Sequence, residues 1–145
     1  SLILNPCSSD EKGIKSAVRN FAKESGRKGI GLKIFEMSGT TAGQATAFGL
    51  LDHGGYLAVV GYSAQKLELR LSNLMAFDAT ARGNWGCPPD QYPHALQLVL
   101  DRKVQIAPFV EPHPLRDAPE IFAAVARREV KRRVILVPEK QEEGK

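Results

Sequence analysis

The stretch from Leu32 to Tyr62 constrains the fold more than any other part of the chain. Apolar segments at 32–37 and 56–60 flank a run of small residues at 42–51 that has a helical pattern. A strand, a helix and a strand joined by short polar turns form a βαβ unit. Such a unit favours a parallel sheet, so the sequence predicts an α/β domain.

A glycine-containing polar turn follows each of the two predicted strands, Ser38-Gly39-Thr40 after the first and Gly61-Tyr62-Ser63 after the second. Glycine lets a backbone approach a ligand closely, but it also makes ordinary tight turns, and both interpretations stay open. Parallel strands end at one edge of the sheet, where ligands bind. The phosphate-binding motif G-x-G-x-x-G is absent, because Gly29-Ile30-Gly31 precedes a strand where the motif must follow one.

Hydrophobic periodicity predicts the flanking elements. A short strand is expected at 1–5, closed by Asn5-Pro6, and a helix after Ser8-Ser9-Asp10-Glu11, which has the spacing of a capping box. Alternation at 65–71 predicts a strand with one exposed face, an edge that could pair with another chain. The other predicted elements are a short helix at 72–77, a strand at 78–84, a helix opening at Pro89-Asp90, a strand at 104–110, a helix capped at Asp117-Ala118-Pro119-Glu120 and a strand at 133–137.

Composition narrows the class of protein. A chain of 145 residues, 43% hydrophobic and 25% charged, is typical of one ordinary soluble domain. No apolar run approaches the ~18–20 residues that cross a bilayer. Cys7 and Cys87 lie outside any metal-binding spacing, and structural or free thiols fit a reducing cytoplasm. The chain lacks an initiator Met and opens on an apolar segment, as expected of a piece cut from a longer protein.

A basic run at 127–133 holds five cations in seven residues. Cations at a helix C-terminus complement the helix dipole. An arginine fork would also suit the oxygens of a phosphate. A nucleic-acid surface is disfavoured, because no aromatic residues are interleaved with the run. The three histidines show no metal-binding i, i+4 pair, and no catalytic triad can be built from the spacing.

Taken together, these segments resemble the C-terminal part of a zinc-type medium-chain alcohol dehydrogenase. The Gly/Pro-rich run Gly83-Asn84-Trp85-Gly86-Cys87-Pro88-Pro89 is also similar to one group within that family, the 6-hydroxycyclohex-1-ene-1-carbonyl-CoA dehydrogenases of anaerobic aromatic degradation. The segments that carry the family resemblance are Leu4-Asn5-Pro6, Lys33–Gly39, Asp52–Gly61, Arg82–Gly86 and Lys131–Leu136.

The resemblance implies the second half of a Rossmann-type parallel sheet plus the C-terminal segment of the catalytic domain. Residues 1–86 would be the C-terminal part of the nicotinamide-dinucleotide-binding domain. Residues 87–138 would return to the catalytic domain, and 139–145 would be a disordered polar tail. In the Rossmann order 3-2-1-4-5-6, residues 1–5 would be strand 3. Strand 3 would then lack a neighbour, because strands 1 and 2 are missing from the sequence.

The resemblance also implies site residues. Ser38-Gly39-Thr40 would lie near the nicotinamide ribose, and Gly61 and Tyr62 would approach the nicotinamide. Backbone groups of Gly83-Asn84-Trp85 would meet the carboxamide, and Arg133 the pyrophosphate. No catalytic residue and no metal ligand is implied in this sequence, because the zinc ligands belong to the absent N-terminal part.

The expected function is part of a cytoplasmic, NAD-dependent alcohol dehydrogenase, with NADP left open. It would transfer hydride between an alcohol and the nicotinamide, with an alicyclic hydroxyacyl-CoA as the narrower expectation for the alcohol. The expected partners are that alcohol or acyl-CoA and a second copy of the chain through the edge 67–71, with no nucleic acid or membrane. The alternatives are a zinc-independent, quinone-reductase-like oxidoreductase and a non-catalytic binding or assembly fragment.

Overall fold

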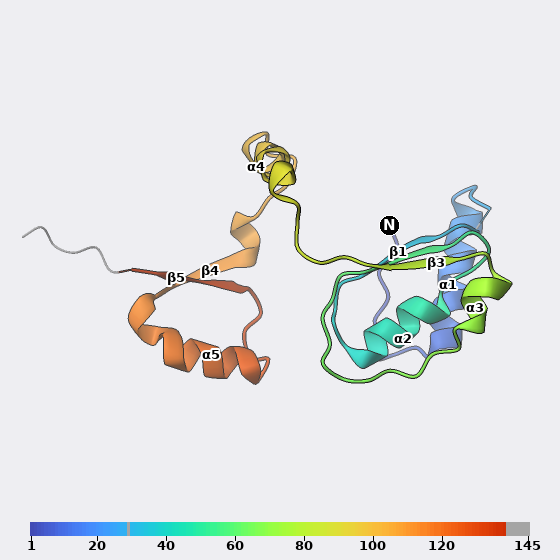
Figure 1. The fold of residues 1–145 in the computed structure, drawn as a ribbon, viewed down its shortest axis with the longest axis horizontal. Coiled ribbons are helices and arrows are strands. Elements are labelled where there is room, and N and C mark those ends of the chain that lie inside the picture. The colour runs from blue at the N-terminus through green and yellow to red at the C-terminus, as the bar shows by residue number, and fades with distance from the viewer. Residues whose placement is uncertain (29, 139–145) are drawn as a thin grey trace, which may run out of the picture. The chain divides into compact units, whose positions relative to one another are not determined.

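The computed structural model describes residues 1–28 and 30–138, so the predicted tail at 139–145 lies outside the described residues. The chain divides into two compact units, the first Ser1–Gly86 and the second beginning at Cys87 (Figure 1). The division falls within the Gly/Pro-rich run at 83–89. Within the described ranges, no helix has the length and apolar character that crossing a membrane requires.

The first unit is built on a three-stranded parallel sheet of order β1-β2-β3. Its strands are β1 (Lys33–Glu36), β2 (Tyr56–Val59) and β3 (Thr80–Gly83). Glu36 pairs with Val59, and Val59 pairs with Gly83, so the three carboxyl ends are level. The fold class predicted from sequence is confirmed, and the order of these strands is that of strands 4, 5 and 6 of a Rossmann sheet.

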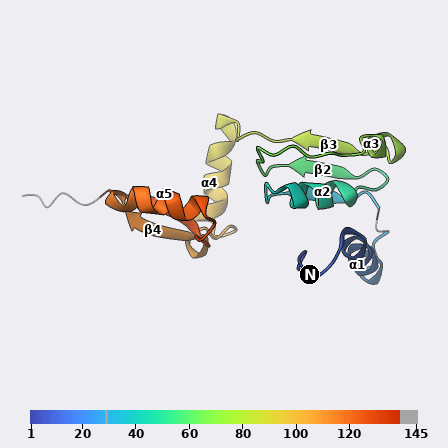
Figure 2. The same ribbon diagram turned by 90° about the horizontal axis from the view of Figure 1, so that it is seen from below.

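Helix α2 (Thr41–Gly49) connects β1 to β2 and lies against the sheet (Figure 2). It contributes Ala47 and Phe48 to the core, where they pack with Leu51 and Leu57. Leu51 is the most buried of these, at 1% exposure. The predicted βαβ unit is therefore confirmed.

Helix α1 (Glu11–Glu24) has Asp10 as its N-cap, because the Asp10 carboxylate accepts from the Gly13 amide at 2.7 Å. The capping box predicted from Ser8 is wrong, since the Ser8 hydroxyl donates to the Asn5 carbonyl instead. The short helix predicted next to β3 is present as α3 (Ser72–Ala76).

Replacing Asp10 by alanine is expected to lower the free energy of unfolding by about 1 kcal/mol, the usual cost of losing an N-cap acceptor. Urea denaturation followed by circular dichroism would measure this change. Asp117→Ala is the matched control, because Asp117 occupies the same position before α5 (Ala118–Ala126) and makes no side-chain cap bond. Equal losses in the two variants would contradict a capping role for Asp10.

Two predicted strands of the first unit are wrong. Residues 1–5 form no strand. A β-strand needs a neighbouring strand to accept and donate its backbone hydrogen bonds, and this segment pairs with none among the described residues. Residues 65–71 also pair with no strand among the described residues. The predicted alternation is nevertheless visible in the burial, since Leu67 and Leu69 are half-buried while Glu68 between them is exposed.

The second unit contains another parallel pair, β4 (Val110–Pro114) and β5 (Arg133–Val137), connected through α5. The strand predicted at 104–110 is misplaced, because Ala107–Phe109 is a 3-10 turn and β4 begins at Val110. Pro108 favours this turn, since its ring fixes φ and removes a donor. The remaining elements of this unit are the 3-10 turns Pro89–Gln91 and Leu115–Asp117 and the helix α4 (Tyr92–Leu100), which begins close to its predicted start.

Candidate functional site

The turns that follow β1 and β2 touch each other at the carboxyl edge of the sheet. A Cβ added at Gly39 would lie 2.3 Å from the Tyr62 carbonyl oxygen. A Cβ added at Gly61 would lie 2.1 Å from the Gly39 nitrogen. Gly39 also has a φ of 62°, a conformation that favours glycine. The structure thus brings the two predicted turns together, and only glycine fits at their contact.

Glu36, the last residue of β1, bonds to both turns. Its side chain is buried, at 4% exposure. Its Oε1 accepts from the Ser38 amide at 2.8 Å, the Ser38 hydroxyl at 2.6 Å and the Gly39 amide at 3.1 Å. Its backbone carbonyl accepts from the amides of Val60 and Gly61, each at 2.9 Å. Sequence reasoning missed Glu36; the only signal was an acidic residue at the end of an apolar strand.

The hydroxyl groups of the first turn serve its own structure. Thr40 is the N-cap of α2, and its Oγ1 accepts from the Gly43 amide at 3.0 Å. On the same helix, the Gln44 side-chain amide donates to the Gly61 carbonyl at 3.2 Å. The first turn of α2 therefore joins the contact between the two loops.

A third segment, Gly83-Asn84-Trp85, follows β3 at the same edge. The backbone amide of Asn84 donates to the Val59 carbonyl at 3.0 Å, which continues the hydrogen bonding between β2 and β3 past the end of β3. Together with Ser38-Gly39-Thr40 and Gly61-Tyr62, this segment forms what we call the rim. A cavity of ≈ 700 Å³, within the range of small-molecule sites, lies along the second and third of these segments. Its lining residues are Val59, Val60, Gly61, Tyr62, Gly83, Asn84, Trp85 and Gly86.

The rim presents aromatic side chains beside exposed backbone. Tyr62 is 78% exposed and Trp85 is 92% exposed. A Cβ added at Gly83 would meet nothing within 4 Å, so the backbone there is open to an approaching group. The rim therefore combines exposed aromatic side chains with accessible peptide groups.

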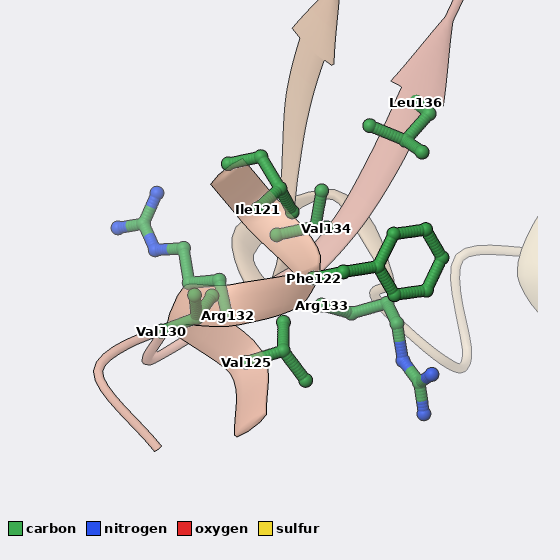
Figure 3. Close-up of a pocket in the computed structure, with 8 residues that line it drawn as sticks. All are labelled: Ile121, Phe122, Val125, Val130, Arg132, Arg133, Val134 and Leu136. Atoms are coloured by element: carbon green, nitrogen blue, oxygen red, sulfur yellow. The ribbon is translucent and has the colours of Figure 1, made fainter. Parts of the chain in front are cut away.

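Arg133 belongs to the second unit, and its surroundings are known only within that unit. It lines a cavity of ≈ 410 Å³ between α5 and β5. Figure 3 shows the side chains of Arg132 and Arg133 on opposite sides of an apolar lining that includes Ile121, Val125 and Val134. The proposed contact of Arg133 with a pyrophosphate stays a prediction.

The basic run begins where α5 ends, with Arg127 at the C-cap. The Arg127 guanidinium donates to both carboxylate oxygens of Glu129, at 2.9 and 2.8 Å, and this hydrogen bonding raises the pKa of Arg127. One cation of the run is therefore already paired with a carboxylate.

The described residues do not supply a metal site. No group of three His, Cys, Asp or Glu side chains lies close enough to hold an ion within residues 1–28 and 30–138. Cys7 and Cys87 are exposed free thiols, as predicted. The residues of this part of the chain therefore do not fit zinc as a ligand set.

The fold of this chain matches part of the fold of solved medium-chain alcohol dehydrogenases. No protein-family model matches the chain, and no curated protein sequence matches it. The three solved structures described next share 19–20% sequence identity with this chain. A likeness at that level of identity shows the fold alone.

Three solved dehydrogenases illustrate the likeness. An alcohol dehydrogenase from Thermotoga maritima has a TM-score of 0.78 and 19% identity, over 94% of this chain and 37% of that one. An alcohol dehydrogenase from Thermus sp. ATN1 has a TM-score of 0.76 and 20% identity, over 94% and 38%. Galactitol-1-phosphate dehydrogenase from Escherichia coli has a TM-score of 0.73 and 20% identity, over 92% and 39%. The chain thus spans little more than a third of each of these proteins.

Proposed function

We propose that this chain is the nicotinamide-binding part of an NAD(P)-dependent alcohol dehydrogenase. The observation that carries the proposal is the rim cavity, with Tyr62 and Trp85 beside the open backbone at Gly83. The oxidoreductase fold of the structural neighbours supports it. A dehydrogenase part is favoured over a non-catalytic assembly fragment, because five of the residues that line the cavity are residues at which the resemblance implies the cofactor: Gly61, Tyr62, Gly83, Asn84 and Trp85.

The residues of this chain would bind and orient the cofactor. The contact between Gly39 and Gly61 would give the ribose and ring a fixed backbone surface. Peptide groups of Gly83-Asn84-Trp85 would hydrogen-bond to the carboxamide, and Arg133 would meet the pyrophosphate. The nicotinamide, when bound, supplies the hydride chemistry. Zinc would be held by residues outside this chain.

The substrate proposed is an alcohol, and the resemblance at 83–89 makes an alicyclic hydroxyacyl-CoA the specific candidate. A zinc-independent quinone-reductase-like reaction is the alternative. We also propose a cytoplasmic location and pairing with a second copy of the chain through residues 67–71. In that segment the exposed side chains alternate with half-buried Leu67 and Leu69, and its backbone pairs with no strand among the described residues, which leaves it available to a second copy.

The proposal predicts that NADH quenches the fluorescence of Trp85, the one tryptophan in the sequence. Quenching is expected to saturate at micromolar NADH, because the indole lies on the cavity that would hold the ring. Trp85→Phe should abolish the quenching signal while calorimetry still detects binding. Tyr92→Phe is the matched control, since Tyr92 is an exposed aromatic residue of α4 in the second unit. Absence of saturable NADH binding to the intact protein would favour the assembly fragment.

A further inference from the structure

We propose that Glu36 is a positioning residue of the rim, whose buried carboxylate fixes the turn 38–40 against the turn 61–62. The cofactor part of this inference rests on the proposed function. Through its side chain Glu36 holds the first turn, and through its backbone carbonyl it holds the second. One residue therefore bonds to two of the three rim segments.

The bonding at Glu36 suits a carboxylate and few other groups. Three donors converge on Oε1: two amides and the Ser38 hydroxyl. A carboxylate oxygen accepts several hydrogen bonds, and bonds to a charged acceptor are stronger than neutral ones. An apolar residue at position 36 would pack in the core but would leave these donors without their acceptor, which is costly in a part-buried site.

The surroundings leave the carboxylate little room to move. A Cβ added at Gly43, in the first turn of α2, would lie 2.1 Å from the Ser38 hydroxyl oxygen and 3.2 Å from Glu36 Oε1. A Cβ added at Gly61 would lie 2.7 Å from Glu36 Oε2. Glycines on both sides thus admit the carboxylate and its donors. The end of β1, the start of α2 and both turns meet at this one side chain.

Asp52 offers a matched comparison inside the same unit. It is also 4% exposed, and its Oδ1 accepts from the amides of Gly31 and Leu32 at 3.1 and 3.3 Å. Neither Glu36 Oε2 nor Asp52 Oδ2 has a hydrogen-bond partner among the described residues. The difference is position: Asp52 precedes β2, at the amino end of the strands, whereas Glu36 lies at the rim.

The test compares Glu36→Gln with Asp52→Asn in the intact protein, using amide hydrogen exchange and calorimetric titration with NADH. The glutamine side chain is uncharged, so its Oε1 accepts the three hydrogen bonds more weakly than a carboxylate oxygen does, and its NH₂ group takes the place of Oε2, which has no partner among the described residues. Exchange at Ser38 and Gly39 is therefore expected to rise about tenfold, and the Kd for NADH about tenfold. Asp52→Asn is expected to accelerate exchange at Gly31 and Leu32 while the Kd stays within about twofold of the unmodified protein.

Unchanged exchange at Ser38 and Gly39 in Glu36→Gln would overturn the inference, as would an equal loss of affinity in both variants. If the unmodified protein does not bind NADH, the proposed function fails, while the exchange data still decide whether Glu36 holds the turns. Ser38→Ala covers the case in which Glu36→Gln does not fold. This substitution removes the hydroxyl donor of Ser38, an exposed residue. The amide hydrogen-exchange rate at Gly39 and the Kd for NADH are each expected to rise about threefold. No change in either quantity would contradict the inference.

Discussion

Replacing Gly61 by alanine is expected to lower the free energy of unfolding of the first unit by about 3 kcal/mol, the upper end of the usual cost of overpacking. The new Cβ would lie 2.1 Å from the Gly39 nitrogen and 2.7 Å from the Gly39 Cα. Both are backbone atoms, so relief requires the two turns to separate. Urea denaturation followed by circular dichroism would measure the loss.

Gly83→Ala is the control for this prediction. Gly83 lies at the end of β3 on the same rim, but a Cβ added there meets nothing within 4 Å. Its free energy of unfolding is expected to change by less than about 0.5 kcal/mol. If Gly61→Ala were as stable as Gly83→Ala, the two turns would have room between them, and the contact described above would be wrong.

Leu51→Ala is expected to destabilise the first unit by about 3–4 kcal/mol. Leu51 is 1% exposed and packs with Phe48 and Leu57, and such truncations cost about 2.7–5 kcal/mol through lost burial and the cavity that remains. The midpoint of urea denaturation should fall while the slope m is unchanged.

Met75→Ala provides a comparable truncation at an exposed site, since Met75 of the same unit is 76% exposed and lies outside the segment 67–71. The expected cost there is below about 0.5 kcal/mol. Similar midpoints for the two variants would show that the core of the unit is not centred on Leu51.

The elements predicted correctly are those whose signals were local. Two apolar runs bounded by glycine turns were enough to predict β1, α2 and β2, because a parallel crossover needs only those pieces in that order. The strands predicted at 1–5 and 65–71 failed for a different reason. Side-chain alternation reports which faces are buried, but a strand also needs a partner for its backbone, and periodicity carries no information on that partner.

The same distinction applies to the candidate site. The meeting of the turns at Gly39 and Gly61 could be predicted, since parallel strands end at one edge. The network at Glu36 could not, because it depends on three donors that converge only after the turn has formed. In the second unit, Pro108 shifted the start of β4 to Val110, a detail that apolar periodicity at 104–110 did not register.

The burial of Glu36 also has a consequence for how β1 selects its alignment. Along Lys33–Glu36, Ile34 and Glu36 face inward, while Lys33 and Phe35 are exposed, Phe35 at 65%. A slip of one residue would turn Lys33 and Phe35 inward and move the carboxylate away from its donors. The slip would bury more apolar surface at Phe35, but it would also bury the Lys33 ammonium and remove Ile34 from the core. The hydrogen bonds of the Glu36 carboxylate therefore add to the burial pattern in selecting the native alignment of this strand.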